Sequence, residues 1–213
     1  GHFARRFLFW LATIRADRVV ANSITEAENM RRWPGLSKKI STIWNGYELS
    51  QFKASLEAPK ATKKLAIVGR IAYPKNGVNV IKALKLFHSR NNYLPLIVWV
   101  GRPDTDPLSV AMQKQMTQMI EADKNLTKSV NFPGEIADVS QIYREVDGII
   151  HMSTFEGLPN VICEAMLSGC PVLASDVCDH PLVLGSNGER GLICDPLDPL
   201  QICQLLESFF DMS

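Results

Sequence analysis

The sequence lacks the features that mark several large classes of protein. No apolar run approaches the ~20 residues of a membrane-spanning helix, and the N-terminus has no apolar segment followed by a small-residue cleavage site. No predicted strand is followed by G-x-G-x-x-G, and G-x-x-x-x-G-K-[ST] is absent. A membrane-spanning protein, a secreted protein, a dinucleotide oxidoreductase and a P-loop NTPase are therefore disfavoured, and a cytoplasmic location is expected.

Paired cysteines and a strong net charge are also missing. The five cysteines are odd in number, lie in the last third and include no C-x-x-C pair, which argues against a disulfide framework or a zinc ribbon. Lys and Arg number 23 against 22 Asp and Glu, so a general nucleic-acid binder is not indicated. Residues 1–60 have 10 basic and 5 acidic side chains, whereas residues 61–213 have 13 and 17. This asymmetry predicts two physical units.

From residue 61 onward, short β-branched runs alternate with longer segments of helical period, as in βαβ units around a parallel sheet. Apolar residues run continuously through several of these segments, which predicts strands covered on both faces. The fold class is therefore α/β, with a Rossmann-like doubly wound parallel sheet. The expected strands span residues 65–69, 96–101, 129–132, 148–151, 171–174 and 191–194.

Two segments allow more than one interpretation. Met112, Met116 and Met119 repeat at helical spacing, where packing into the core is favoured over lining a ligand groove. The basic-aromatic opening, Arg5-Arg6-Phe7-Leu8-Phe9-Trp10, fits an interfacial membrane helix at the inner face of the membrane, and it also fits a helix separated from its partner domain. The second interpretation is favoured.

Residues 1–50 predict a helix over 3–14, a strand over 18–21, a helix over 25–33 and a strand over 40–44.

The first loop of the predicted sheet, which follows the strand ending at Gly69, contains two cations. Ligands of open α/β sheets bind beyond the carboxyl ends of the strands. Arg70 lies at the strand tip and Lys75 in the turn before the next helix. A guanidinium and an ammonium that converge there suit a diphosphate, although two solvated surface cations fit the residue types equally well.

The fourth loop, after residue 151, combines an anion cradle with two acids. Gly157 permits close approach of the backbone, Pro159 fits a first helical position, and the free amides of a helix start can bind a phosphate. Glu156 precedes this helix and Glu164 falls in its second turn, and a carboxylate accepts hydrogen bonds from both hydroxyls of a diol. The loop thus favours a ligand with phosphate and sugar parts over an ordinary helix start.

These residues carry a resemblance to a known family. The chain resembles the donor-binding half of retaining glycosyltransferases of family 4, which have the two-domain GT-B architecture. Five elements of the family stand here in the expected order: Val19-Val20-Ala21-Asn22-Ser23, Trp44-Asn45-Gly46-Tyr47-Glu48, Gly69-Arg70…Lys75-Asn76-Gly77, the E-x7-E element Glu156 to Glu164, and Gly191-Leu192-Ile193-Cys194-Asp195-Pro196-Leu197-Asp198.

The resemblance implies a division of the chain and roles for its residues. Residues 1–50 would be the end of an acceptor-binding domain, 51–63 a linker and 64–213 the donor-binding domain. Arg70 and Lys75 match the residues that neutralise the nucleotide diphosphate, Glu164 the residue that holds the ribose hydroxyls, and Glu156 the residue near the hydroxyls of the transferred sugar. The backbone segments that match the donor-binding positions are Gly69, Gly157, Leu158, Pro159 and Asn160.

The implied activity is transfer of a hexosyl group with retained configuration, as in cell-surface polysaccharide synthesis. The donor would be a UDP- or GDP-sugar, the acceptor a saccharide or a lipid-linked saccharide, and no metal or other cofactor is expected. Because most of the N-terminal domain is missing, this chain is expected to bind nucleotide weakly and to catalyse nothing by itself. A nucleotide-sugar 2-epimerase and a non-catalytic nucleotide-sugar-binding domain stay open as alternatives.

The sequence departs from the family pattern in three places. The turn at residues 45–48 lacks the preceding proline and has Tyr47-Glu48 in place of Val-Asp, and the loop at residues 102–106 lacks the usual Asp-Gly-Pro. Residues 177–182 replace a Gly-Gly segment that is followed by Glu, which leaves the sugar open. A catalytic or metal role for Cys178, Asp179 and His180 is disfavoured because adjacent residues rarely converge on one atom. Contact of His151 with a phosphate is the less favoured interpretation of that residue. In the loop after Gly101, the sequence predicts that Asp104 and Asp106 belong to a solvated loop rather than a cation site.

Overall fold

The computed structural model describes residues 2–52, 63–185 and 189–212, and their side chains from residue 7 onward. The chain folds as two compact units, Gly1–Gly46 and Tyr47–Ser213, which we call unit 1 and unit 2. No helix among the described residues combines the length and the apolar character that a membrane crossing requires.

Unit 1 pairs two short parallel strands with two helices. Its elements are α1 (His2–Ile14), β1 (Val19–Ala21), α2 (Ile24–Arg31) and β2 (Ile40–Thr42), close to the four predicted segments. Ser23 caps α2 by accepting a hydrogen bond from the amide of Glu26. The small core gathers Ala21, Ala27, Met30, Leu36 and Ile40. Phe7, Leu8 and Phe9 of α1 stay about half exposed or more, and Arg5 and Arg6 lie outside the described side chains.

Unit 2 is built on six parallel strands in the order β5-β4-β3-β6-β7-β8. Their bounds are β3 (Lys64–Val68), β4 (Leu96–Val100), β5 (Val130–Gly134), β6 (Gly148–His151), β7 (Val172–Ser175) and β8 (Leu192–Cys194). The chain runs outward in one direction from β3 and in the other from β6, so these two central strands form the topological switch point. The predicted doubly wound parallel sheet is confirmed.

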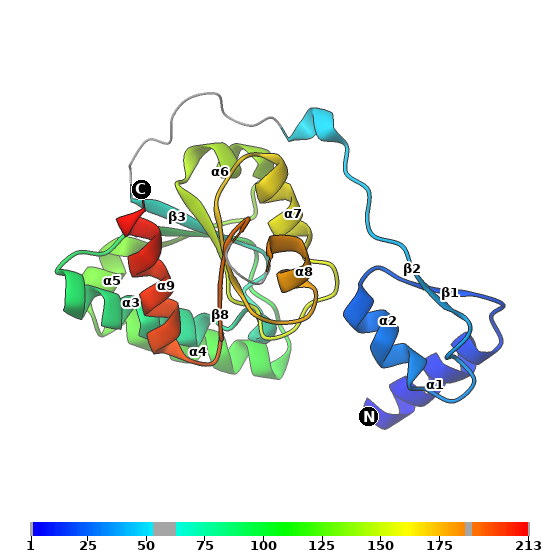
Figure 1. Ribbon diagram of the computed structural model, residues 1–213. Helices are drawn as coiled ribbons and strands as arrows, with labels where there is room; N and C mark the ends of the chain where they lie inside the picture. Colours follow the sequence, from blue (N-terminus) through cyan, green and yellow to red (C-terminus); the bar gives the residue numbers. More distant parts are fainter. Residues whose placement is uncertain (1, 53–62, 186–188, 213) are drawn as a thin grey trace. The chain divides into compact units, whose positions relative to one another are not determined.

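Helices cover both faces of this sheet (Figure 1). They are α3 (Gly77–Asn91), α4 (Pro107–Glu121), α5 (Lys124–Ser129), α6 (Val139–Glu145), α7 (Asn160–Leu167), α8 (His180–Leu184) and α9 (Pro199–Asp211), with short 3-10 turns η1 (Leu49–Gln51) and η2 (Tyr73–Lys75). Side chains of α3, α4 and α9 share one apolar cluster, and side chains of α6, α7 and α8 share the other. The loops that join strands and helices therefore lie at the amino and carboxyl ends of the strands.

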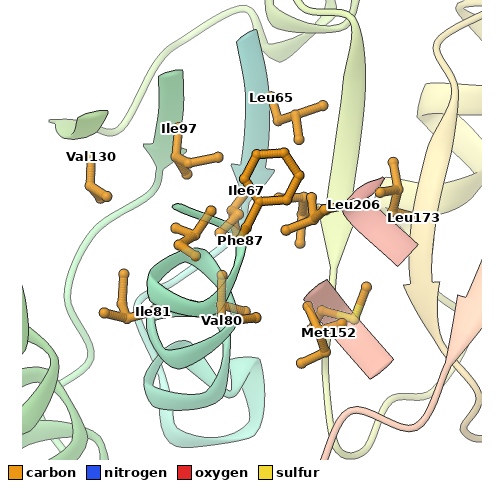
Figure 2. Close-up of a cluster of buried hydrophobic side chains, with 14 of the residues drawn as sticks. Leu65, Ile67, Val80, Ile81, Phe87, Ile97, Val130, Met152, Leu173 and Leu206 are labelled. Carbon is orange, nitrogen blue, oxygen red and sulfur yellow. The ribbon is translucent and has the colours of Figure 1, made fainter. Parts of the chain in front are cut away.

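Strand β3 shows how the sequence divides between the two clusters. Leu65 and Ile67 point into the α3 side, where Figure 2 shows them around Phe87. Ala66 and Val68 point into the opposite cluster, since successive side chains of a strand face opposite ways. Met112 and Met116 are buried in the first cluster, so the packing interpretation of the methionine repeat is confirmed.

Candidate functional site

The loop after β3 passes so close to the loop after β4 that Gly101 has no room for a side chain. Gly69 has φ +133° and Gly101 has φ +149°, and a Cβ on Gly101 would lie 2.1 Å from the carbonyl oxygen of Gly69. Nε1 of Trp99 donates to that same oxygen at 3.1 Å. The chain therefore leaves the sheet at Gly69 in a fixed direction.

Turn η2 then directs Lys75 back over the strand end. Asn76 ends the turn in the left-handed conformation, with φ 58°, and its side-chain amide donates to the carbonyl of Pro196 at 2.6 Å. Cε of Lys75 lies 3.2 Å from where a Cβ of Gly69 would stand. The glycine thus leaves room for the lysine side chain to lie across the tip of β3.

The first and fourth loops meet at the switch point, as the sequence predicts for the carboxyl ends of neighbouring strands. The amide of Thr154 donates to the carbonyl of Pro74 at 2.8 Å. Nζ of Lys75 lies 2.5 Å from Oε1 of Glu156. A backbone hydrogen bond and an ion pair therefore join two loops that are 81 residues apart in sequence.

Glu156 is held by three side chains, one from each of the two loops and one from the end of β6. Besides Lys75, the hydroxyl of Ser153 donates to Oε1 at 2.7 Å, and Nε2 of His151 lies 3.4 Å from the same oxygen. Burial alone would raise the pKa of Glu156, but the hydrogen bond with His151 and the charge of Lys75 outweigh it and hold the pKa well below its usual range. Glu156 is therefore an ionised, oriented carboxylate.

The imidazoles behind Glu156 are buried and uncharged at neutral pH. Burial lowers the pKa of His151 to about 4 and also lowers the pKa of His180. The two rings meet edge to face with centroids 5.2 Å apart, and Nδ1 of His180 donates to the carbonyl of Ser175 at 2.8 Å. His151 is thus buried and contacts Glu156. A buried imidazole does not fit a direct contact with a phosphate at the surface.

The start of α7 differs from the prediction by one position. Pro159 is the N-cap, and the helix begins at Asn160, because the ψ of Pro159 is 85° and not helical. The amide of Asn160 donates to the carbonyl of Leu158 at 3.0 Å and is not available to an anion. The amides of Gly157 and Leu158 have no hydrogen-bond acceptor among the described residues. An anion at this helix start would meet those two amides.

Glu164 lies half buried in the second turn of α7. The hydroxyl of Tyr143, from α6, donates to its Oε2 at 2.7 Å. Burial, followed by the hydrogen bond to Glu164, raises the pKa of Tyr143, so the phenol stays protonated and remains a donor. Within the described part of the chain no other side chain donates to this carboxylate.

The loop after β4 is largely exposed, as the sequence predicts, and it supplies an ion-pair partner for Arg70. Nη1 of Arg70 forms an ion pair with Oδ2 of Asp104 in the loop after β4, and the arginine side chain is 61% exposed. Asp106, from the same loop, caps α4 by accepting hydrogen bonds from the amides of Leu108 and Ser109. Asp104 therefore pairs with a cation of the chain, and Asp106 stabilises the start of α4.

Three adjacent residues that follow β7, Cys178, Asp179 and His180, have different surroundings. Asp179 and His180 are buried, whereas Cys178 is partly exposed and adopts φ 51°. Sγ of Cys178 accepts a hydrogen bond from the amide of Glu156 at 3.4 Å. Across residues 2–52, 63–185 and 189–212 no three His, Cys, Asp or Glu side chains are placed to hold a metal ion.

Two hollows border the joined loops. One of about 580 Å³ lies among the loops after β6, β7 and β8, and one of about 330 Å³ lies between η2 and the starts of α3 and α4. Thr154 and Leu197 line both hollows. Space for a ligand thus adjoins the loop that carries Glu156.

Sequence reasoning missed the residues that orient the two acids. Tyr143 occupies an apolar position of α6 in the core, and Ser153 precedes Glu156 by three residues. A buried tyrosine needs a partner for its hydroxyl, and that requirement was the signal available for Tyr143. Tyr47 was also missed as a contact residue: its hydroxyl donates to Oδ1 of Asn160 at 2.8 Å.

Comparison with known families decides the class. The model of the family described as "Glycosyl transferases group 1" matches residues 62–211, which is most of the chain. The chain belongs to this family. The resemblance to GT-B glycosyltransferases is thereby confirmed for this group 1 glycosyltransferase domain.

Relatives and solved structures extend the similarity beyond the matched domain. The chain is 24% identical over 223 residues to D-inositol 3-phosphate glycosyltransferase of Corynebacterium diphtheriae, covering 98% of this chain and 51% of that protein. It is 27% identical over 149 residues to the Escherichia coli UDP-Gal:alpha-D-GlcNAc-diphosphoundecaprenol alpha-1,3-galactosyltransferase, covering 65% of this chain and 37% of the relative. This group 1 domain thus spans about half or less of the length of these relatives.

The crystal structure of Anabaena HepE in complex with UDP and glucose has the same fold. The TM-score is 0.78 at 24% identity, with 95% of this chain and 56% of that chain covered. The likeness includes the arrangement of the six-stranded sheet and its helices.

Proposed function

We propose that the chain is the donor-binding part of a retaining glycosyltransferase, which transfers a hexosyl group from a UDP- or GDP-sugar to a saccharide or lipid-linked acceptor. One observation carries the proposal. The ion pair of Lys75 and Glu156 lies at the switch point of the sheet, beside the amides of Gly157 and Leu158, for which the described residues provide no acceptor. In a doubly wound fold this edge is where a ligand binds.

Each part of a nucleotide sugar has a matching group at this edge. Lys75, Arg70 and the amides of Gly157 and Leu158 suit the diphosphate, because they offer fixed positive charge and oriented donors. Glu164, oriented by Tyr143, suits the ribose diol. Glu156 suits a hydroxyl of the transferred sugar, since Ser153 and His151 keep the carboxylate ionised and oriented when the ammonium of Lys75 turns to a phosphate.

The proposed chemistry is the exchange of one C–O bond for another. The bond from the anomeric carbon to the diphosphate oxygen breaks, a bond to the acceptor oxygen forms on the same face, and the departing oxygen takes the proton of the acceptor hydroxyl. Lys75 and Arg70 stabilise the charge that develops on the leaving group, which is how preorganised cations lower a barrier. The proposal needs no metal ion, and it places the reaction in the cytoplasm with unit 1 as the end of the acceptor-binding domain.

The proposal favours UDP-sugars for the first experiments. The E. coli relative is named for UDP-Gal and a diphosphoundecaprenol acceptor, and the HepE crystal contains UDP and glucose. Thermal denaturation of the chain with UDP, GDP, UDP-sugars and GDP-sugars tests binding directly. A ligand at 100 times its dissociation constant adds about 2.7 kcal/mol to the free energy of unfolding.

Site variants make the test specific. Arg70→Ala and Glu164→Ala are each expected to abolish the nucleotide-induced shift while the fold stays intact. Arg90→Ala is a matched control, because Arg90 pairs with Glu207 at 2.9 Å and plays no part in the proposed site. Equal shifts in all three variants contradict the proposal.

Turnover separates this function from the alternatives. The protein with its acceptor half restored is expected to give a product whose new linkage keeps the anomeric configuration of the donor. Conversion of the donor sugar without acceptor identifies a 2-epimerase instead. Nucleotide binding with no turnover of any donor identifies a binding domain.

A further inference from the structure

We propose that Asp104 is an internal counter-ion of Arg70, one that holds the guanidinium while the site is empty and that the diphosphate of the donor must displace. This inference rests on the proposed function, because it takes Arg70 as a diphosphate ligand. Asp104 acts through Arg70 and is therefore a positioning residue that sets the affinity for the donor.

The loop after β4 fixes Asp104 from several sides. Its amide donates to the carbonyl of Ile71 at 3.2 Å. Its own carbonyl accepts from Nε2 of Gln113 at 2.9 Å, and the same nitrogen donates to Ile71 at 2.6 Å. A parallel bridge joins Ile71 to Pro103. The backbone that carries the carboxylate is thus attached to the backbone that carries Arg70.

The two partners of the ion pair differ in freedom. Asp104 is 21% exposed, and its Oδ1 accepts from the amide of Thr105 at 2.8 Å while Oδ2 binds Arg70. The Arg70 side chain is 61% exposed and extends from a strand tip. When a ligand arrives, the arginine is the partner that can turn. The carboxylate stays in place because its backbone and its Oδ1 keep their hydrogen bonds.

The charges of the site explain why the ion pair of Arg70 and Asp104 should affect the affinity for the donor. The two cations of the site, Arg70 and Lys75, are each paired with an acid, so the four side chains together carry no net charge. Glu156 has other hydrogen-bond partners and a role towards the sugar in the proposed function. Asp104 has no such role, so its carboxylate competes with the diphosphate for Arg70.

The size of the effect follows from the exposure of the pair. An exposed ion pair contributes up to about 1 kcal/mol, which corresponds to roughly a fivefold change in an equilibrium constant. Asp104→Asn removes the charge and keeps both backbone hydrogen bonds, and its side-chain oxygen can still accept from Thr105. We therefore expect the dissociation constant for UDP or GDP to fall about two- to fivefold at low salt, with a smaller gain at ~0.3 M salt.

A double-mutant cycle tests whether the effect passes through Arg70. Isothermal titration of UDP and GDP, at nucleotide concentrations high enough to follow the weak residual binding of Arg70→Ala, compares the unmodified chain with Asp104→Asn, Arg70→Ala and the double variant. The gain from Asp104→Asn is expected to vanish in the Arg70→Ala background. Glu145→Gln is the matched control, because it removes one acid from an ion pair with Lys64 at the amino end of β3.

The outcomes separate this inference from the function on which it rests. Unchanged or weaker nucleotide binding by Asp104→Asn overturns the inference, and so does an equal gain in the Arg70→Ala background or in Glu145→Gln. If one of these results is found and Arg70→Ala still lowers the affinity for nucleotide, the inference about Asp104 is wrong but the proposed function is retained. Absence of UDP and GDP binding to the unmodified chain, or binding that Arg70→Ala leaves unchanged, overturns both.

Discussion

Acid is expected to destabilise unit 2 through the buried imidazole of His151. His151 is 2% exposed at the end of β6, between Glu156 and His180, and its burial lowers the pKa to about 4 from an ordinary value of 6.5. As the pH falls below 6.5, the unfolded chain takes up a proton that the folded chain refuses. Stability is therefore lost progressively from about pH 6.5 to about pH 4, and this loss stops below pH 4 because both states are then protonated.

The magnitude follows from the separation of the two pKa values. At about 1.4 kcal/mol for each pKa unit, acidification from pH 7 to pH 4.5 removes about 2.5 kcal/mol from the free energy of unfolding of unit 2. Burial also lowers the pKa of His180, which adds to the loss in the same direction. The depressed pKa of Glu156 acts later, because its stabilisation is lost only once the pH falls below the unfolded value of 4.5.

Urea unfolding at a series of pH values measures this loss. Trp99 lies in unit 2 and the other three tryptophans lie in residues 1–46, so replacing those three by phenylalanine makes fluorescence report on unit 2. His151→Leu is expected to show a pH dependence that is smaller by about 2.5 kcal/mol over the same range. A parent protein whose stability is constant between pH 7 and pH 4.5, or a leucine variant that loses as much as the parent, refutes the reasoning.

Two further predictions concern the frame of the site. Tyr143→Phe removes the donor that orients Glu164, so the dissociation constant for UDP or GDP is expected to rise about two- to tenfold in titration calorimetry, whereas Tyr93→Phe serves as the unchanged control. An equal effect of both phenylalanines would falsify the role given to Tyr143. Gly101→Ala places a Cβ 2.1 Å from the oxygen of Gly69 and is expected to cost about 3 kcal/mol or more of stability in urea unfolding. Gly134→Ala is the matched control, because Gly134 has φ +85° and the described residues place no atom within 4 Å of the new Cβ. Its loss of stability, which should be smaller, measures backbone strain without a steric clash. Similar losses in both variants would mean that the close approach at Gly101 does not cause the destabilisation.

The sheet was predictable because its strands are buried on both faces and therefore appear as unbroken apolar runs. Their ends were less predictable. The first two strands end at Val68 and Val100, one residue earlier than expected, because Gly69 and Gly101 turn away with positive φ. The third strand extends to Gly134, beyond the predicted end at Phe132, where β5 pairs irregularly with β4.

Within the site, the sequence could predict which residues share an edge but not how they pair. The position of Lys75 and Glu156 follows from the rule that parallel strands end at the same edge. The partner of Arg70 does not, because Asp104 reaches it only through a loop that Gln113 and Ile71 hold in place. Long-range contacts of this kind leave no periodic signal in the sequence.

Two contacts that join the loops matter for engineering. They are the backbone hydrogen bond from Thr154 to Pro74 and the ion pair between Lys75 and Glu156. A chimaera that takes only one of these two loops from a relative separates a backbone donor from its acceptor and an ammonium from its carboxylate. If the proposed function holds, donor preference should be transferred only when both loops are exchanged together, and exchange of a single loop should weaken binding.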